Sequence, residues 1–176
     1  VNPLDLDILP TSAPGQGVDS DAPPTIIYFV RHAETDPTPP HFPLNASGQL
    51  RAQAFSRTVS AVKFTHVFSS HTTRARQMVE PVAVRQGLEI TQQPTPGMRL
   101  DTVVVSDFTP SEAATAPLVN ALRALPRGSR ALVGVNSDNV FAVMNGLGVP
   151  VGTEDHPCNP GATCVPCLTN ACAAAR

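Results

Sequence analysis

The chain has 176 residues, a length that suits one domain of ordinary size with appendages. Its 12 basic and 14 acidic residues give a formal net charge of −2 and are not segregated into blocks, so no electrostatic basis exists for binding nucleic acid or anionic lipid. No apolar run approaches the roughly 18 residues that span a bilayer, and we therefore expect no membrane insertion.

Residues 1–24 are predicted to form a Pro-rich arm that precedes the domain. Residues 4–9 alternate apolar and acidic side chains, which predicts a short strand with one buried face, ended by Pro10. Residues 11–24 are rich in Gly, Pro, Ser and Asp and predict a linker. Because a lone strand is unstable in water, we expect residues 4–9 to pair with the sheet of their own chain or with that of a second copy.

Strands alternate with helices over residues 25–151. Apolar and β-branched runs predict strands at residues 25–30, 65–70, 88–91 and 130–135, and apolar periodicity predicts helices from Asn45, after residue 70, from Thr109 and over residues 139–145. This order predicts the α/β class, with a three-layer α/β/α sandwich and a mostly parallel central sheet. We expect the domain to be truncated at its C-terminus, and any site to lie at the carboxyl ends of the strands.

Some of these elements carry expectations about burial. The run at residues 25–30 is typical of a central parallel strand that is covered on both faces. In the helix from Asn45, the predicted buried side consists of Leu50, Ala54, Phe55 and Val62. In the next helix, the predicted apolar stripe consists of Ala75, Met78, Val79 and Val82.

Residues 152–176 form a Cys-rich tail with little material for a core. It contains all four cysteines of the chain, Cys158, Cys164, Cys167 and Cys172. An even number of cysteines in a short segment predicts two disulfides, with the pairing left open, and thus a secreted, periplasmic or cell-surface protein. The start at Val1, without a leader, agrees with removal of an export signal or with trimming. The alternative is a zinc site made by these thiols with His156.

Four segments carry a family resemblance. Residues 27–35 read Ile-Tyr-Phe-Val-Arg-His-Ala-Glu-Thr, and residues 44–54 read Leu-Asn-Ala-Ser-Gly-Gln-Leu-Arg-Ala-Gln-Ala. Residues 69–77 read Ser-Ser-His-Thr-Thr-Arg-Ala-Arg-Gln, and residues 132–140 read Leu-Val-Gly-Val-Asn-Ser-Asp-Asn-Val. In this order and at this spacing they resemble the signature segments of the histidine phosphatase superfamily, the phosphoglycerate mutase-like group. The matches cover residues 26–150.

The resemblance implies a reaction and its residues. His32 would attack a phosphoryl group and form a phosphohistidine that water then opens. Arg31 and Arg74 would hold the phosphate, since planar guanidinium groups suit its oxygens. The substrate would be a phosphate-containing small molecule or a phosphoprotein, and the mechanism requires neither a metal nor an organic cofactor.

The catalytic set departs from the family pattern at several positions. Asn136 stands where the family has its second histidine; it would join the phosphate-binding set as a hydrogen-bond donor without charge. Losing a charged donor of this kind typically costs about 10²–10³ in rate. The candidate general acids are Glu34, Asp101 and Asp138, none of them in a segment like the family's acidic insertion. His71 is expected to be a solvated loop residue.

These departures leave two hypotheses open. In the first, the chain is an exported phosphatase-like hydrolase with weak activity through His32. In the second, it is a pseudoenzyme, a structural or binding subunit of the same fold. Such a subunit would form homo-oligomers, including filaments, by exchange of its N-terminal strand.

Overall fold

The computed structural model describes residues 23–38, 41–94, 99–100, 103–104, 111–137, 139–149, 157–159 and 162–163. In chain order, its elements are β1 (Ile26–Arg31), α1 (Ala46–Thr58), β2 (His66–Ser69), α2 (Thr73–Gln86), β3 (Ile90–Gln92), β4 (Arg99–Leu100), β5 (Val103–Val104), α3 (Ser111–Arg123), β6 (Arg130–Val135), α4 (Val140–Gly146), β7 (Pro157–Asn159) and β8 (Ala162–Thr163). The predicted arm strand at residues 4–9 lies outside the described residues.

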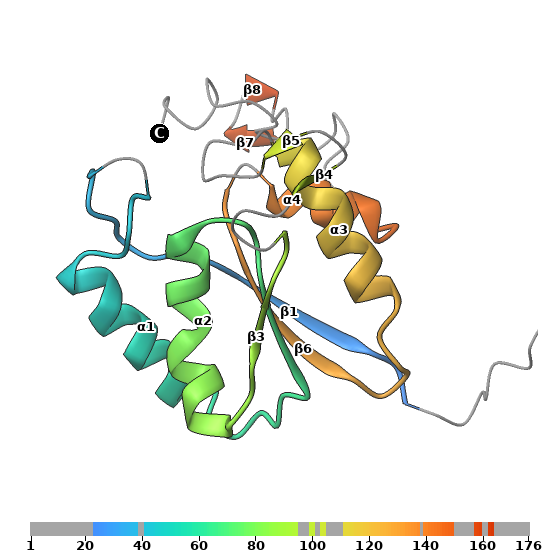
Figure 1. Ribbon diagram of the computed structural model, residues 1–176, viewed down its shortest axis with the longest axis horizontal. Helices are drawn as coiled ribbons and strands as arrows, with labels where there is room; N and C mark the ends of the chain where they lie inside the picture. Colours follow the sequence, from blue (N-terminus) through green and yellow to red (C-terminus); the bar gives the residue numbers. More distant parts are fainter. Residues whose placement is uncertain are drawn as a thin grey trace, which may run out of the picture.

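Four parallel strands form the central sheet in the order β1-β6-β2-β3 (Figure 1). Side chains of β2 and β6 pack on one face against α2 and on the other against α3 and α4. Helix α1 packs beside α2. The predicted three-layer α/β/α sandwich is confirmed. Two further pairs are antiparallel, β4 with β5 and β7 with β8.

Strand β6 is one of the two interior strands, and its burial follows from its composition. Five of its residues, Ala131 to Val135, are buried, as the continuous apolar run predicts. Gly134 brings α2 close to the sheet, since a Cβ atom there would lie only 2.4 Å from the carbonyl oxygen of Ala75. The carboxyl end of β6 is therefore held directly beneath the start of α2.

The expectation that residues 25–30 form a central strand is wrong. Within the described sheet, β1 occupies an edge and pairs with β6 alone. Its exposure alternates along the strand, and Ile26 and Tyr28 are 42% and 36% exposed. An apolar run indicates a strand that packs against other elements, but it does not specify how many strands flank it.

The predicted buried side of the helix that begins after Asn45 is confirmed only in part: Phe55 and Val62 pack against the core, but Leu50 and Ala54 are exposed. Leu50 is 65% exposed, and the buried residues of α1 are Gly48, Ala52 and Ser56. Small side chains let α1 approach α2 closely, and the Ser56 hydroxyl donates a hydrogen bond to the carbonyl oxygen of Pro81 within α2. Small residues of α1 thus make its contact with α2, while Leu50 is left exposed.

The other helices agree with their predictions where they are described. All four residues of the predicted α2 stripe are buried, and Gly87 ends this helix in the left-handed conformation. Helix α3 begins at Ser111 and buries Leu118 and Leu122; its predicted cap at Thr109 lies outside the described residues. Among the described helices, none combines the length and apolarity needed to cross a membrane.

Candidate active site

Three chain segments that carry predicted site residues meet at one end of the sheet. The backbone N–H of His32, just after β1, donates to the carbonyl oxygen of Val135 in β6 over 3.1 Å. On the other side of β6, the backbone N–H of Ser70 donates to the carbonyl oxygen of Gly134 over 2.8 Å. The carboxyl ends of β1, β6 and β2 are thereby joined, as expected for a site in a parallel α/β sheet.

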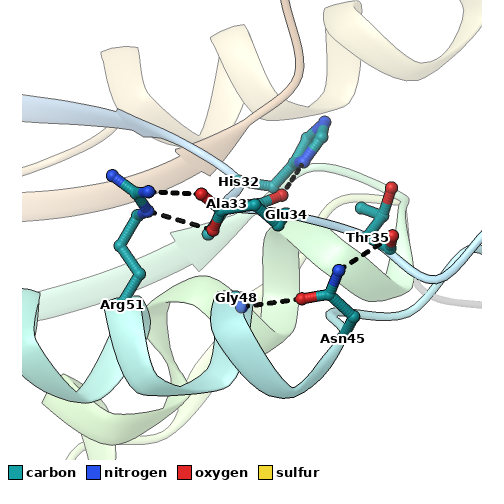
Figure 2. A network of polar contacts seen from close by, with 7 residues as sticks. All are labelled: His32, Ala33, Glu34, Thr35, Asn45, Gly48 and Arg51. Carbon is teal, nitrogen blue, oxygen red and sulfur yellow. Dashed lines mark hydrogen bonds and ion pairs between the residues drawn. The ribbon is translucent and has the colours of Figure 1, made fainter.

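His32 is partly buried, and its ring orientation is set by a local contact. Its Nδ1 atom lies 2.8 Å from the carbonyl oxygen of Ala33 (Figure 2). A carbonyl oxygen can only accept a hydrogen bond, so Nδ1 carries the proton in the neutral ring. The lone pair of the neutral ring then resides on Nε2, so Nε2 rather than Nδ1 is the atom that would act as a nucleophile.

A shallow hollow of about 420 Å³ lies along the segment that follows β1. It is lined by Arg31, His32, Ala33, Glu34, Thr35 and Arg51. The Arg31 side chain is exposed and makes no hydrogen bond or ion pair with the other residues that the structure describes. Arg31 and His32 therefore face a common space that solvent reaches.

The carboxylate of Glu34 is engaged by Arg51 from α1. The Nε atom of Arg51 donates to Oε2 of Glu34 over 3.0 Å, and its second contact joins Nη2 to Oε1 (Figure 2). The hydrogen bond from Arg51 holds the pKa of Glu34 below its ordinary value. A carboxyl group held ionised in this way is poorly suited to deliver a proton at neutral pH, which argues against Glu34 as the general acid.

The start of α1 packs tightly against the backbone of Glu34. Asn45 caps the helix, since its side-chain oxygen accepts from the Gly48 N–H over 2.9 Å (Figure 2). The backbone N–H of Asn45 donates to the Glu34 carbonyl oxygen over 3.0 Å. A Cβ atom on Gly48 would lie 2.1 Å from that same carbonyl oxygen. Only glycine permits this approach, which carries Arg51, one turn later, to the Glu34 carboxylate.

Arg74 reaches the same end of the sheet from the first turn of α2. Its guanidinium carbon lies 6.0 Å from the centre of the Phe42 ring. Phe42 lies in a loop, and its own backbone φ angle is +41°. Arg74 does not line the hollow beside His32. The loop that leads into α2 is held by Gln92, whose side chain donates to the carbonyl oxygen of His71 over 3.0 Å.

Asn136 is 2% exposed and is part of a polar network at the end of β6. The Thr72 hydroxyl donates to its side-chain oxygen over 2.9 Å, and its Nδ2 lies 3.4 Å from the Ser70 hydroxyl. Its backbone N–H donates to the Asn139 side chain over 2.9 Å. The side-chain oxygen and one amide hydrogen of Asn136 thus bond to protein, and the second amide hydrogen has no partner among the residues that the structure describes.

The remaining predicted residues have different outcomes. His71 is buried, with 4% exposure, so the expectation of a solvated loop histidine is wrong. Asp101, Asp138 and the four cysteine side chains lie outside the described residues. In the part of the chain that the structure describes, no three His, Cys, Asp or Glu side chains gather as metal ligands would.

Arg51 and Thr72 contribute to this end of the molecule, yet the sequence alone did not single them out. Arg51 lies within the second matched segment, but its partner Glu34 lies 17 residues earlier, so no local pattern pointed to their contact. For Thr72, its place as the N-cap of α2 was visible, but its contact with Asn136 spans 64 residues and is fixed by the topology.

Comparison with known proteins agrees with this fold. Residues 27–97 match the family model described as the histidine phosphatase superfamily (branch 1). The solved structure of Bacillus stearothermophilus YhfR is similar, with 17% identity and a TM-score of 0.50 over 70% of this chain and 79% of that one. A putative phosphohistidine phosphatase SixA from Agrobacterium tumefaciens is 20% identical, with a TM-score of 0.44 over 72% and 85% of the two chains.

A mycobacterial glucosyl-3-phosphoglycerate phosphatase is 12% identical, with a TM-score of 0.48 over 68% of this chain and 76% of the other. Among curated proteins, none matches this sequence. The family-model match covers the β1 end with Arg31 and His32, and continues through α2 with Arg74. Residues 27–97 of this chain thus match the histidine phosphatase superfamily, and the parallel α/β fold of the chain is that of YhfR.

Proposed function

We propose that this chain hydrolyses phosphomonoesters or phosphohistidine, with His32 as the nucleophile. The observation that carries the proposal is the contact between His32 Nδ1 and the Ala33 carbonyl oxygen, because it leaves the lone pair on Nε2. Nε2 forms a bond to phosphorus while the bond from phosphorus to the leaving group breaks. Water then attacks the phosphohistidine and releases inorganic phosphate.

Arg31, Arg74 and the remaining amide hydrogen of Asn136 hold the phosphate in this proposal. Two guanidinium groups supply charge for the phosphoryl oxygens, and Asn136 supplies a neutral donor. Because Asn136 brings no positive charge, the expected rate is lower by about 10²–10³ than with a charged donor. We expect weak activity.

The source of the leaving-group proton restricts the substrate. Glu34 is held ionised by Arg51, and the other acid candidates are Asp101 and Asp138. Leaving groups that depart without a strong acid are therefore favoured, such as the imidazole of phosphohistidine or an activated phenol. An aryl phosphate is the appropriate first substrate.

The test compares aryl phosphate hydrolysis by the wild-type chain and by His32→Ala. The control is His66→Ala, because His66 lies at the start of β2, at the opposite end of the sheet. We expect the His32 variant to fall to the background rate and the His66 variant to keep the wild-type rate. Equal rates for wild type and His32→Ala would exclude this function.

A second candidate function is a catalytically silent subunit that assembles by strand exchange. The observation in its favour is that β1 pairs on one side only within the described sheet and exposes Ile26 and Tyr28. The alternating segment at residues 4–9 suits addition to such an edge, including in a neighbouring copy within a filament. Light scattering before and after deletion of residues 1–10 tests this. A monomer in both cases would rule out assembly through the arm.

Export and a tail joined by two disulfides complete the proposal. Thiol titration of the unfolded, unreduced protein should then detect no free sulfhydryl among Cys158, Cys164, Cys167 and Cys172. Four reactive thiols would refute the disulfides and leave the zinc site as the alternative.

A further inference from the structure

Helices α1 and α2 lie side by side (Figure 1), and two hollows of about 420 Å³ and 320 Å³ lie between them. The two hollows share Gln53 of α1 and Pro81 of α2, so together they form one groove. The residues that line it recur at intervals of three and four along each helix, so they belong to one face of each.

Small residues form the bottom of this groove, where the two helices meet. Ala52 is buried, and the Ser56 hydroxyl donates to the carbonyl oxygen of Pro81 over 3.0 Å. The same hydroxyl oxygen accepts from Nε of Arg85 over 3.1 Å. This bond holds the Arg85 guanidinium beside the groove, and its two terminal nitrogens have no partner among the described residues.

The end of the groove near the helix C-termini is positively charged. Arg57 and Arg85 lie in the last turns of α1 and α2 and line the same hollow, and no acidic residue lines it with them. Neither guanidinium makes an ion pair with another residue that the structure describes. Val84, which lines this hollow too, is 76% exposed. The hollow therefore presents two like charges and an apolar surface to solvent.

This combination favours a ligand that carries carboxylates next to an apolar group. Two carboxylates would relieve the repulsion between Arg57 and Arg85, and the planar guanidinium group suits a carboxylate well. Nucleic acid and anionic membranes fit less well, because affinity for them grows with the number of cations that meet phosphates. Among the residues that line this hollow, two are cationic.

We propose that the groove between α1 and α2 binds an extended acidic segment of a partner protein, with two adjacent carboxylates followed by an apolar residue. Successive side chains of an extended segment point to opposite sides. The first carboxylate meets Arg85 on α2, the second meets Arg57 on α1, and the apolar side chain returns to α2 at Val84. The groove shares no lining residue with the hollow beside His32, so this inference is independent of the proposed phosphatase activity.

The test measures peptide binding to the full chain by fluorescence anisotropy at low salt. The labelled probe carries Asp-Asp-Leu between glycines, and its matched control carries Asn-Asn-Leu. The protein variants are Arg57→Gln, Arg85→Gln and the double variant. Arg130→Gln is the control, because Arg130 is exposed at the start of β6 and lines neither hollow.

We expect each single variant, Arg57→Gln or Arg85→Gln, to weaken the acidic peptide about threefold to fivefold, and the double variant about tenfold to twentyfold. The asparagine peptide should bind wild type as weakly as the acidic peptide binds the double variant. Arg130→Gln should keep the wild-type dissociation constant. Reversing both charges, with Arg57→Glu and Arg85→Glu, should abolish binding of the acidic peptide and create binding of a Lys-Lys-Leu peptide, which only a folded groove can show.

Three results would overturn the proposal. If wild type binds the acidic and asparagine peptides equally, or if the double Gln variant binds as wild type does, the arginines serve only the helix C-termini. If a short oligothymidylate binds more tightly than the acidic peptide and is lost in the double variant, the ligand is a nucleic acid. If the acidic peptide binds only after deletion of residues 1–10, the chain's own N-terminal arm occupies the groove in place of a partner.

Discussion

The hydroxyl of Thr72 donates a hydrogen bond to the side-chain oxygen of Asn136 over 2.9 Å, and both residues are buried. Thr72 caps α2, the helix that carries Arg74, and Asn136 follows β6. This bond therefore links the helix that carries a predicted phosphate ligand to the end of an interior strand. Asn136 has a structural role here in addition to the phosphate contact proposed for it.

Replacing Asn136 with Ala should lower the free energy of unfolding by about 1–3 kcal/mol, because the Thr72 hydroxyl loses its buried acceptor. Urea unfolding measures the change. Asn120→Ala is the matched control, since Asn120 is exposed on α3, and it should stay within about 0.5 kcal/mol of wild type. Equal stability of the two variants would show that the Asn136 network contributes nothing.

Ser69 and Ser70 are adjacent and buried, yet only Ser70 has a hydrogen-bond partner for its hydroxyl among the described residues. Ser69→Ala removes an unsatisfied polar atom and should leave stability unchanged or raise it. Ser70→Ala leaves the Asn136 amide without that partner and should cost about 1 kcal/mol. Thermal unfolding of the two variants side by side measures the difference, and the reverse order would contradict the assigned contacts.

Local sequence patterns predicted the elements of the fold well where burial is continuous. Strand β6 has the predicted bounds, and the stripe of α2 is the predicted one, because each depends on residues close together in the chain. The edge position of β1 depends on which strands pair with it, and the exposure of Leu50 depends on how closely α1 packs against α2. Such contacts join distant residues and leave no local pattern.

In the candidate site, too, features set by neighbouring residues could be predicted from the sequence, and features set by contacts between distant residues could not. His32 and Arg31 follow directly from the end of a strand, so a short motif was sufficient to predict that they lie side by side at the edge of the sheet. The burial of Asn136 and the commitment of Glu34 to Arg51 arise from contacts across 17 or more residues. These contacts decide whether a side chain is available for chemistry, and local spacing does not encode them.

Gly48→Ala should destabilise the protein by about 1–3 kcal/mol, although alanine is the better helix former, because the added Cβ atom would lie 2.1 Å from the Glu34 carbonyl oxygen. Ser47→Ala, at the exposed neighbouring position, is the control and should be neutral or slightly stabilising. Urea unfolding compares the two. A gain in stability for Gly48→Ala would mean that α1 does not pack against residue 34 in this way.

The Arg51–Glu34 pair should make stability depend on pH in the acid range. Arg51 lowers the pKa of Glu34 in the folded chain. The contribution of the ion pair to the free energy of unfolding is therefore fully present above the ordinary pKa of glutamate, and it is lost as the pH falls through the lowered pKa. The difference in unfolding free energy between wild type and Glu34→Gln should therefore narrow on acidification. Urea unfolding at neutral and acid pH measures it. If this difference in unfolding free energy grew on acidification, the pKa of Glu34 would be raised rather than lowered in the folded chain, which would contradict the ion pair with Arg51.

Phe42 combines a backbone cost with a contact that favours Arg74. Its φ of +41° lies in the left-handed region, where a bulky residue is strained, while its ring lies 6.0 Å from the Arg74 guanidinium carbon. Phe42→Gly removes both the strain and the ring, whereas Phe42→Leu removes the ring alone. We expect the Gly variant to be more stable than the Leu variant by about 1 kcal/mol in urea unfolding.

Both Phe42 variants should bind phenylphosphonate more weakly by about twofold to fivefold, because Arg74 loses the ring against which it lies. Calorimetry with that probe measures the change, and wild type provides the reference. The two measurements separate the two roles, since the variants differ in stability but share the same binding loss. If Phe42→Leu bound as tightly as wild type, the ring would have no part in placing Arg74. If it were as stable as Phe42→Gly, the backbone at residue 42 would not be held in the left-handed conformation.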